Sequence, residues 1–370
     1  MNPVRKGLFG LPVAAALVAL PLIGVRLKGY PVARYLEFPP LTRYVEHAGF
    51  SWPAFVVLAL LALALFVPMV RLLARAWAAR PRANPARPFP AWGWLGVAFT
   101  AGAWVLAWTR FPWFAPLQRF TFTPLWLGYI VVVNALVCRR TGSCMMTARP
   151  RFFLALFPVS AVFWWYFEYL NRFVQNWYYA GVEAISPLQY FVEATLPFST
   201  VLPAVLGTYE LLDSVFGAPA AASRPAPGRS WVAVLLLAVA ALGLAFLAVW
   251  PDILFPLLWV SPLLVISALR MLAGRPFLEP GPDGRVARRA ALLAASALIC
   301  GFFWEMWNFH SLARWIYAVP FVNRFHLFEM PLLGYAGYLP FGLECALIGD
   351  VVRGRKSSAA SPSTPAPALR

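Results

Sequence analysis

Residues 51–70, SWPAFVVLALLALALFVPMV, carry no charged side chain over twenty consecutive positions. A helix needs about 20 predominantly apolar residues to cross a bilayer, so this stretch predicts a transmembrane helix. The whole chain has the same character, because 61% of its 370 residues are hydrophobic and only 12% are charged. This composition predicts an all-α, polytopic membrane protein and excludes an ordinary soluble globule.

Ten apolar stretches predict about ten transmembrane helices. They cover residues 8–25, 51–70, 91–109, 123–138, 152–170, 188–209, 231–250, 253–270, 290–308 and 327–349. When the N-terminus is placed inside, 22 of the 31 Lys and Arg residues fall in inside segments. Since Lys and Arg gather in cytoplasmic loops, this split predicts a bacterial-type inner membrane protein with both termini cytoplasmic. It also accounts for the net charge of +17 without a nucleic-acid partner.

A rare sequence pattern, [FW]-E-x-x-N-x(5,6)-W-x-Y, occurs at residues 167–179 and again at residues 304–317. The similarity extends over the flanking helices, so residues 89–215 and 231–352 predict two four-helix repeats. Each repeat has an even number of spans. The two therefore enter the membrane in the same direction, related by an axis along the membrane normal.

The remaining segments lie outside this internal repeat. Residues 1–88 predict two N-terminal transmembrane helices joined by an outer loop at residues 29–51. That loop is either a plain surface connection or a cover over the outer mouth of the bundle. Residues 216–230 predict a linker, and residues 353–370 predict a disordered cytoplasmic tail.

Acidic and amide side chains within or at the edge of the predicted spans are candidate catalytic residues: Glu168, Asn171, Glu193, Glu305, Asn308 and Glu329. A charge at the bilayer centre costs roughly 2.5–3.5 kcal/mol, so these groups are expected to face the bundle interior. The E-x-x-N spacing places each Glu and its Asn on one side of a helix.

Each of these residues also has a structural interpretation. The Glu–Asn pairs are alternatively caps that fix helix–loop turns by hydrogen bonds. Glu193 and Glu329 are alternatively partners of Arg172, Arg314 or Arg324 in ion pairs. Glu210 and Glu344 lie deeper toward the cytoplasm and are more typical of helix interfaces.

Aromatic side chains flank the carboxylates and are candidate substrate-binding residues: Trp165, Trp177, Tyr179, Trp304, Trp315 and Tyr317. They are alternatively an interfacial aromatic belt. Aromatic faces stabilise cations, and a carboxyl group in apolar surroundings can remain protonated and act as a general acid. These properties suit proton-initiated chemistry on an apolar alkene, but they also suit a cation site.

In its general organisation of small duplicated helical units with carboxylates and aromatics, the chain is similar to membrane carotenoid cyclases. It lacks their proline-flanked paired-Glu signature, and its nearest counterparts are Glu329-Met330-Pro331 and the PFGLE at residues 340–344. The sequence is therefore assigned to no family.

Three functions remain open from the sequence. The first is a membrane-embedded enzyme that uses intramembrane Glu and Asn residues for acid–base chemistry on a lipid or isoprenoid. The second is a proton- or cation-coupled transporter or channel. The third is a structural or assembly membrane protein. The expected partners are membrane lipids and an apolar small molecule, and the sequence predicts no cofactor and no metal site.

Overall fold

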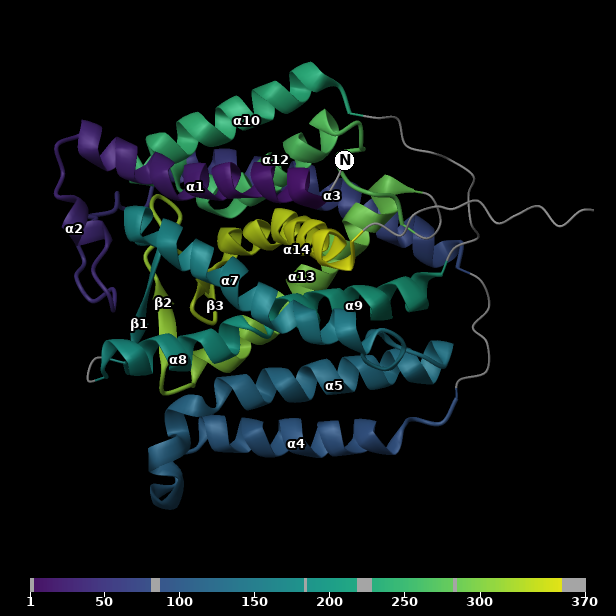
Figure 1. The fold of residues 1–370 in the computed structure, drawn as a ribbon. Coiled ribbons are helices and arrows are strands. Elements are labelled where there is room, and N and C mark those ends of the chain that lie inside the picture. Colours follow the sequence, from purple (N-terminus) through teal and green to yellow (C-terminus); the bar gives the residue numbers. More distant parts are fainter. Residues whose placement is uncertain (1–2, 81–86, 183–184, 218–227, 282–284, 355–370) are drawn as a thin grey trace, which may run out of the picture.

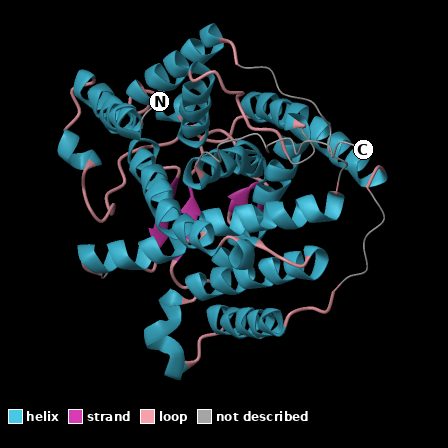
Figure 2. Cartoon of the chain, turned by 45° about the vertical axis from the view of Figure 1, so that its right-hand side comes forward, coloured by secondary structure: helices cyan, strands magenta, loops and turns pink. Residues whose placement is uncertain are grey.

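The computed structural model describes the chain except for residues 1–2, 81–86, 183–184, 218–227, 282–284 and 355–370. The linker predicted at 216–230 and the tail predicted at 353–370 therefore lie largely outside the described residues. Within them the chain is 73% helical, which confirms an all-α architecture. Figure 1 shows the helices packed side by side, and Figure 2 shows the few strands enclosed among them.

Each predicted apolar stretch contains helix. The helices are α1 (Pro3–Leu27), α3 (Trp52–Ala78), α4 (Ala91–Trp108), α5 (Phe122–Thr141), α7 (Pro150–Val174), α8 (Pro187–Phe198) with α9 (Val201–Phe216), α10 (Ser230–Ala245), α12 (Pro256–Leu272), α13 (Val286–Phe309) and α14 (Tyr338–Arg353). Seven helical segments of the described chain are long and apolar enough to cross a membrane, whereas α1, α10 and α12 offer shorter apolar segments. These helices identify the chain as a polytopic membrane protein.

Short elements connect these helices. They are α2 (Val32–Tyr35), η1 (Pro112–Phe120), α6 (Met145–Ala148), β1 (Trp177–Ala180), α11 (Pro251–Leu254), β2 (Arg314–Tyr317), β3 (His326–Leu327), β4 (Met330–Pro331) and η2 (Leu332–Gly337). The strands lie at the end of the bundle on the left of Figure 1, which we call the strand end. The opposite end, which we call the arginine end, holds the termini of α5, α9, α12 and α14 with their flanking arginines.

The sixth predicted span is broken into two helices, α8 and α9, between Phe198 and Val201. Prolines at 197 and 203 remove backbone donors on both sides of the break. Ser160 of α7 bridges the break, since its hydroxyl donates to the Phe198 carbonyl at 2.6 Å and accepts from the Leu202 amide at 3.1 Å. The freed backbone groups are thus satisfied inside the protein, as a membrane requires.

The last span begins and ends a few residues later than the sequence predicted, at Leu332–Arg353. A helix over residues 327–349 is wrong at its start, because residues 326–331 form the strand pair β3–β4 and η2 follows. Pro331, Gly334 and Gly337 interrupt a helix there, and α14 begins only at Tyr338.

Helix packing is alike in the two halves of the chain. Helix α4 packs on α5 as α10 packs on α12, and α7 packs on α9 as α13 packs on α14. Helices α9 and α13 contact each other across the centre. The N-terminal helices pack on the second half, α1 on α10 and α3 on α13.

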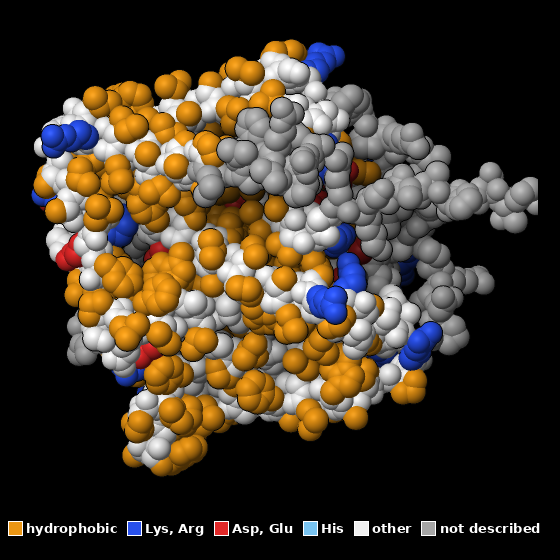
Figure 3. Space-filling model, in the orientation of Figure 1, with side chains coloured by type: hydrophobic (Ala, Val, Ile, Leu, Met, Phe, Trp, Pro, Cys, Tyr) orange, Lys and Arg blue, Asp and Glu red, His pale blue; other side chains and the backbone are white. Residues whose placement is uncertain are grey.

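The outer surface of the bundle is strongly apolar. Helix α3 exposes a row of large side chains, including Val57, Leu60, Leu61 and Leu65, which are all more than half exposed. In Figure 3 hydrophobic side chains cover much of the face, and most charged atoms seen lie toward the two ends. Such a surface is suited to lipid and not to water.

Close contact between α13 and α14 depends on Gly342. A Cβ at this position would overlap the Leu293 carbonyl, which is rigid helix backbone. We expect Gly342→Ala to lower the stability of the protein by about 1–3 kcal/mol, because overpacking forces the helices apart. Thermal unfolding in detergent measures the effect. Gly337→Ala is the control, since a Cβ there meets nothing within 4 Å. Equal melting temperatures for the two variants would contradict this packing.

Candidate functional site

The centre of the site is the antiparallel pair β1–β2, which joins the two halves of the chain. Trp177 lies opposite Tyr317, and Tyr179 lies opposite Trp315. Opposite residues of such a pair share a face, so these four aromatic side chains point the same way. The middle pair is Tyr178 with Ile316, which are equivalent positions of the repeated sequence pattern. The register therefore gives the pair a local two-fold symmetry.

Asn171 and Asn308 hold the two strands in place. The Asn308 side chain donates to the Trp315 carbonyl at 2.8 Å and accepts from the Trp315 amide at 2.9 Å. Asn171 makes the same two bonds with Trp177, at 2.8 and 3.4 Å. Both side chains are buried, and neither lines the apolar cavity beside the strand aromatics, whereas Asn171 borders a separate polar cavity. Their geometry is that of positioning residues, which favours the capping interpretation for the two asparagines.

Glu168, on α7, lies directly behind β1. Its Oε1 accepts from the indoles of Trp164 and Trp177, at 3.2 and 3.1 Å, and from the hydroxyl of Tyr179 at 2.5 Å. The residue is only 6% exposed. Trp177 and Tyr179, the two donors from β1, lie on the face that β1 shares with β2. Pairing of the two strands and hydrogen bonding to Glu168 therefore depend on each other.

Glu305, on α13, occupies the equivalent place behind β2. Its Oε1 accepts from the hydroxyls of Tyr317 and Tyr338, at 2.9 and 2.8 Å. The residue is fully buried, and its Oε2 has no hydrogen-bond partner among the described residues. A buried carboxyl oxygen without a donor is costly when ionised, and Glu305 shares this feature with the fully buried Glu344, whose Oε2 also has no hydrogen-bond partner among the described residues.

All donors to the two carboxylates are neutral side chains. Neither Glu168 nor Glu305 forms an ion pair within the described part of the chain. Burial raises the pKa of Tyr179 and of Tyr317 well above the usual value of about 10. Both hydroxyls on the strands therefore keep their protons and donate.

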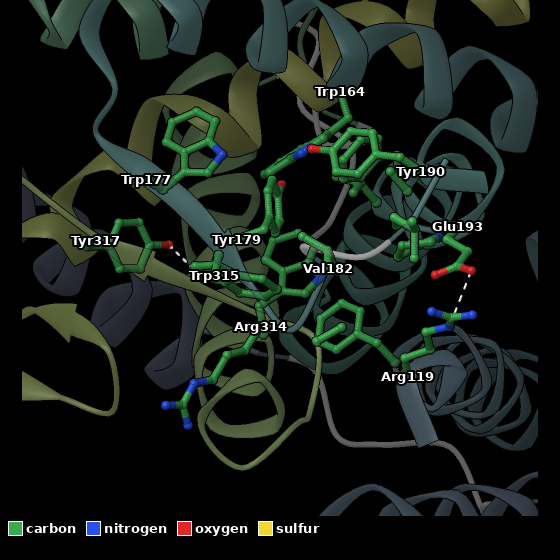
Figure 4. Close-up of a pocket in the computed structure, with 18 of the residues that line it drawn as sticks. Arg119, Trp164, Trp177, Tyr179, Val182, Tyr190, Glu193, Arg314, Trp315 and Tyr317 are labelled. Atoms are coloured by element: carbon green, nitrogen blue, oxygen red, sulfur yellow. Dashed lines mark hydrogen bonds and ion pairs between the residues drawn. The ribbon is translucent and has the colours of Figure 1, made fainter. Parts of the chain in front are cut away.

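An apolar cavity of about 130 Å³ lies against the aromatic face of the strand pair (Figure 4). Its walls come from both halves: Trp164, Trp177, Tyr179, Tyr190, Phe198, Trp259, Trp304, Trp315, Tyr317 and Tyr338. All five side chains that donate to the two carboxylates are thus also wall residues: Trp164, Trp177, Tyr179, Tyr317 and Tyr338. The aromatic rings of the wall present their faces to a bound molecule. Glu168 lies behind the part of the wall that β1 forms, and Glu305 lies behind the part that β2 forms.

One donor to each carboxylate comes from a helix, and this helix differs between the two halves. In the first half it is Trp164, one helical turn before Glu168. The position one turn before Glu305 is Gly301, where a Cβ would overlap the ring of Tyr338. Tyr338, at the start of α14, occupies that space, and its counterpart at the start of α9 is Val201. The two halves differ at these positions, but each carboxylate keeps one aromatic donor from a helix.

The other predicted catalytic carboxylates lie apart from this pair. Glu193 lines the edge of the cavity and faces Arg119, with Oε1 and Nε 3.3 Å apart, so its predicted pairing with Arg172 is wrong (Figure 4). Arg172 pairs with Glu37 instead. Glu329 is half-buried in the turn between β3 and β4 and does not line the cavity.

Five of the six predicted substrate-binding aromatics line the cavity. The exception is Trp165, which points away from it, stacks on Phe191 and donates to Thr195. Four further aromatic residues line the cavity and were not predicted from the sequence: Trp164, Tyr190, Trp259 and Tyr338. Periodicity offered one signal, because Trp164 lies four residues before Glu168 and shares its helix face.

No family model, curated protein or solved structure matches this chain. Among the described residues there is no group of three or more His, Cys, Asp or Glu residues that could hold a metal ion. The site therefore defines the molecule only as a polytopic helical membrane protein that has two buried carboxyl groups beside an aromatic cavity. The hydrogen-bond donors to both carboxyl groups are uncharged side chains.

The asparagine clamp can be tested directly. We expect Asn308→Ala to destabilise the protein by about 1–3 kcal/mol, because it leaves the buried amide and carbonyl of Trp315 without partners. Thermal unfolding in detergent measures the loss. Asn323→Ala is the control, since Asn323 is exposed and its side chain is hydrogen-bonded to that of His326, which is also exposed. A loss no larger than that of the control would show that the clamp contributes nothing.

Proposed function

We propose that the protein is a membrane-embedded enzyme that performs acid–base chemistry on a lipid or isoprenoid in the aromatic cavity. One observation carries the proposal: two buried carboxyl groups bind neutral donors whose rings form the cavity wall. Glu193 pairs with Arg119 instead, and the fully buried Glu344 accepts from the Leu263 amide and lies outside the cavity wall.

The chemistry that fits this arrangement is the addition and removal of a proton at a carbon–carbon double bond. Addition of a proton forms a carbocation, which the surrounding indole and phenol faces stabilise. Loss of a proton from a neighbouring carbon restores a double bond, so an isomerisation or cyclisation needs no oxidant or reductant. Glu168 and Glu305 are the candidate acid and base, and Tyr179 and Tyr317 connect them to the cavity.

The two halves are proposed to derive from one duplicated four-helix unit. Support comes from the matched asparagine clamps, the self-symmetric strand register and the equivalent helix packing. We propose that the protein lies in a bacterial-type inner membrane. The arginine end faces the cytoplasm and the strand end faces the opposite side, because positive charge gathers in cytoplasmic loops.

A proton- or cation-coupled transporter is the second candidate. It is favoured by polar cavities on both sides of the aromatic one, of about 250 Å³ at the strand end and about 470 Å³ at the arginine end. The arginine-end cavity contains ion pairs, such as Arg149–Glu210 and Arg289–Asp350. The aromatic cavity between them is lined mainly by apolar and aromatic side chains, which favours the enzyme.

Removing one carboxyl group tests the enzyme. We expect a host that carries the wild-type chain to contain a lipid or isoprenoid product that is at least about a hundredfold lower with Glu168→Gln or Glu305→Gln, since a general acid or base contributes this much or more. Mass spectrometry of total lipid extracts measures the product.

Glu344→Gln is the matched control. Glu344 is also a fully buried carboxyl group, but it accepts from the Leu263 amide and does not line the aromatic cavity. Normal product with this variant, at equal membrane insertion, would assign the loss to the site. Unchanged product with both Glu168→Gln and Glu305→Gln would reject the enzyme and turn attention to proton flux.

A further inference from the structure

The two buried carboxyl groups differ in their access to polar surroundings. Glu168 lines the strand-end cavity of about 250 Å³, and its donors line the aromatic cavity on the other side. It is therefore part of the wall between a polar space and an apolar one. Glu305 is fully buried and lines neither cavity.

Polar side chains surround the strand-end cavity, including Arg43, His47, Asn171, Arg172 and Gln175. Two of its basic side chains face acids: Arg172 pairs with Glu37 at 3.3 Å, and His47 Nδ1 lies 2.6 Å from Asp252 Oδ1. Arg43 stacks over the ring of Tyr178. A space with such walls holds water, because the walls offer several hydrogen-bonding partners.

The loop between α2 and α3 covers this cavity. Helix α7 ends at Val174, and the left-handed backbone of the next residue, Gln175 (φ 49°), turns its side chain toward the loop. The Gln175 side chain accepts from the amides of Tyr44 and Val45, at 2.8 and 2.9 Å, and donates to the Thr42 carbonyl. The long loop predicted between the first two spans is thus a cover over this end and not a plain connection.

We propose that protons enter the site from the strand-end cavity and that Glu168 is the acid that delivers them. A hydronium ion in the cavity gives a proton to the Glu168 carboxylate and is left as water. The protonated Glu168 then reverses its hydrogen bond with Tyr179: the carboxyl group gives its proton to the Tyr179 oxygen as the Tyr179 hydroxyl gives its own to a substrate carbon, so the tyrosine is unchanged. Glu305 takes the proton lost from the substrate through Tyr317 or Tyr338 and releases it to solvent in an opening of the structure before the next turnover. This inference rests on the proposed function.

Hydrogen–deuterium exchange of the two carboxyl groups tests the route without any substrate. Infrared spectroscopy of the full chain in lipid nanodiscs, at a pH where both groups are protonated, follows their C=O bands after transfer to D₂O. Glu168→Gln and Glu305→Gln assign the bands. We expect Glu168 to exchange at least about tenfold faster than Glu305, because only Glu305 needs an opening of the structure. Equal rates would overturn the route.

A second test of the proton route fills the strand-end cavity with larger side chains. Ala318 and Val45 line this cavity, so Ala318→Phe and, in a separate protein, Val45→Trp should slow Glu168 exchange by about tenfold or more as their rings displace water. Ala194→Phe is the matched control, because Ala194 lines the aromatic cavity alone and leaves the proton route open. Unchanged Glu168 exchange in both cavity-filling variants, with both proteins folded, would overturn the proposal.

Different results would reject the proposed enzyme and the proposed proton route. Fast Glu168 exchange together with unchanged lipid extracts supports the proton route and rejects the enzyme. Equal exchange rates together with a product that depends on Glu168 reject the route and leave the enzyme standing.

Discussion

The structure depends on one constraint, which is the burial of Glu168 and Glu305 without a cationic partner. Removal of a carboxyl group from water is costly unless donors replace the lost hydration. Here the donors are tyrosines and tryptophans that the β1–β2 pair carries, together with Trp164 and Tyr338 from the helices. The strand pair is held by the two asparagine clamps, so the clamp, the strand and the carboxyl group form one unit in each half.

Much of this could be predicted from composition and spacing. The apolar stretches indicated every long helix, and the repeated E-x-x-N pattern selected both buried carboxyl groups and both clamps. Glu305 and Asn308 share a helix face because they are three residues apart, which is a local property. The broken helix at Pro197 and Pro203 also follows from local backbone chemistry.

The rest depends on contacts between residues far apart in the sequence. The pairing of Trp177 with Tyr317 joins two halves of the chain, and no local pattern gives its register. Tyr338 reaches Glu305 only because Gly301 leaves room for its ring. Arg119 was not predicted as the partner of Glu193 because their contact joins η1 to α8. Such contacts also make the two halves unequal, since Glu168 borders a polar space and Glu305 does not.

The central claim is that the aromatic cavity holds an apolar molecule beside these carboxyl groups. Native mass spectrometry of the purified chain, compared with Ala194→Trp, tests it most directly, because the added indole fills the cavity. Leu60→Trp, on the exposed face of α3, controls for general lipid binding. The account predicts that one class of apolar molecule stays with the wild-type chain and with Leu60→Trp but is absent from Ala194→Trp. The same bound molecules in all three proteins, or none in any, would contradict it.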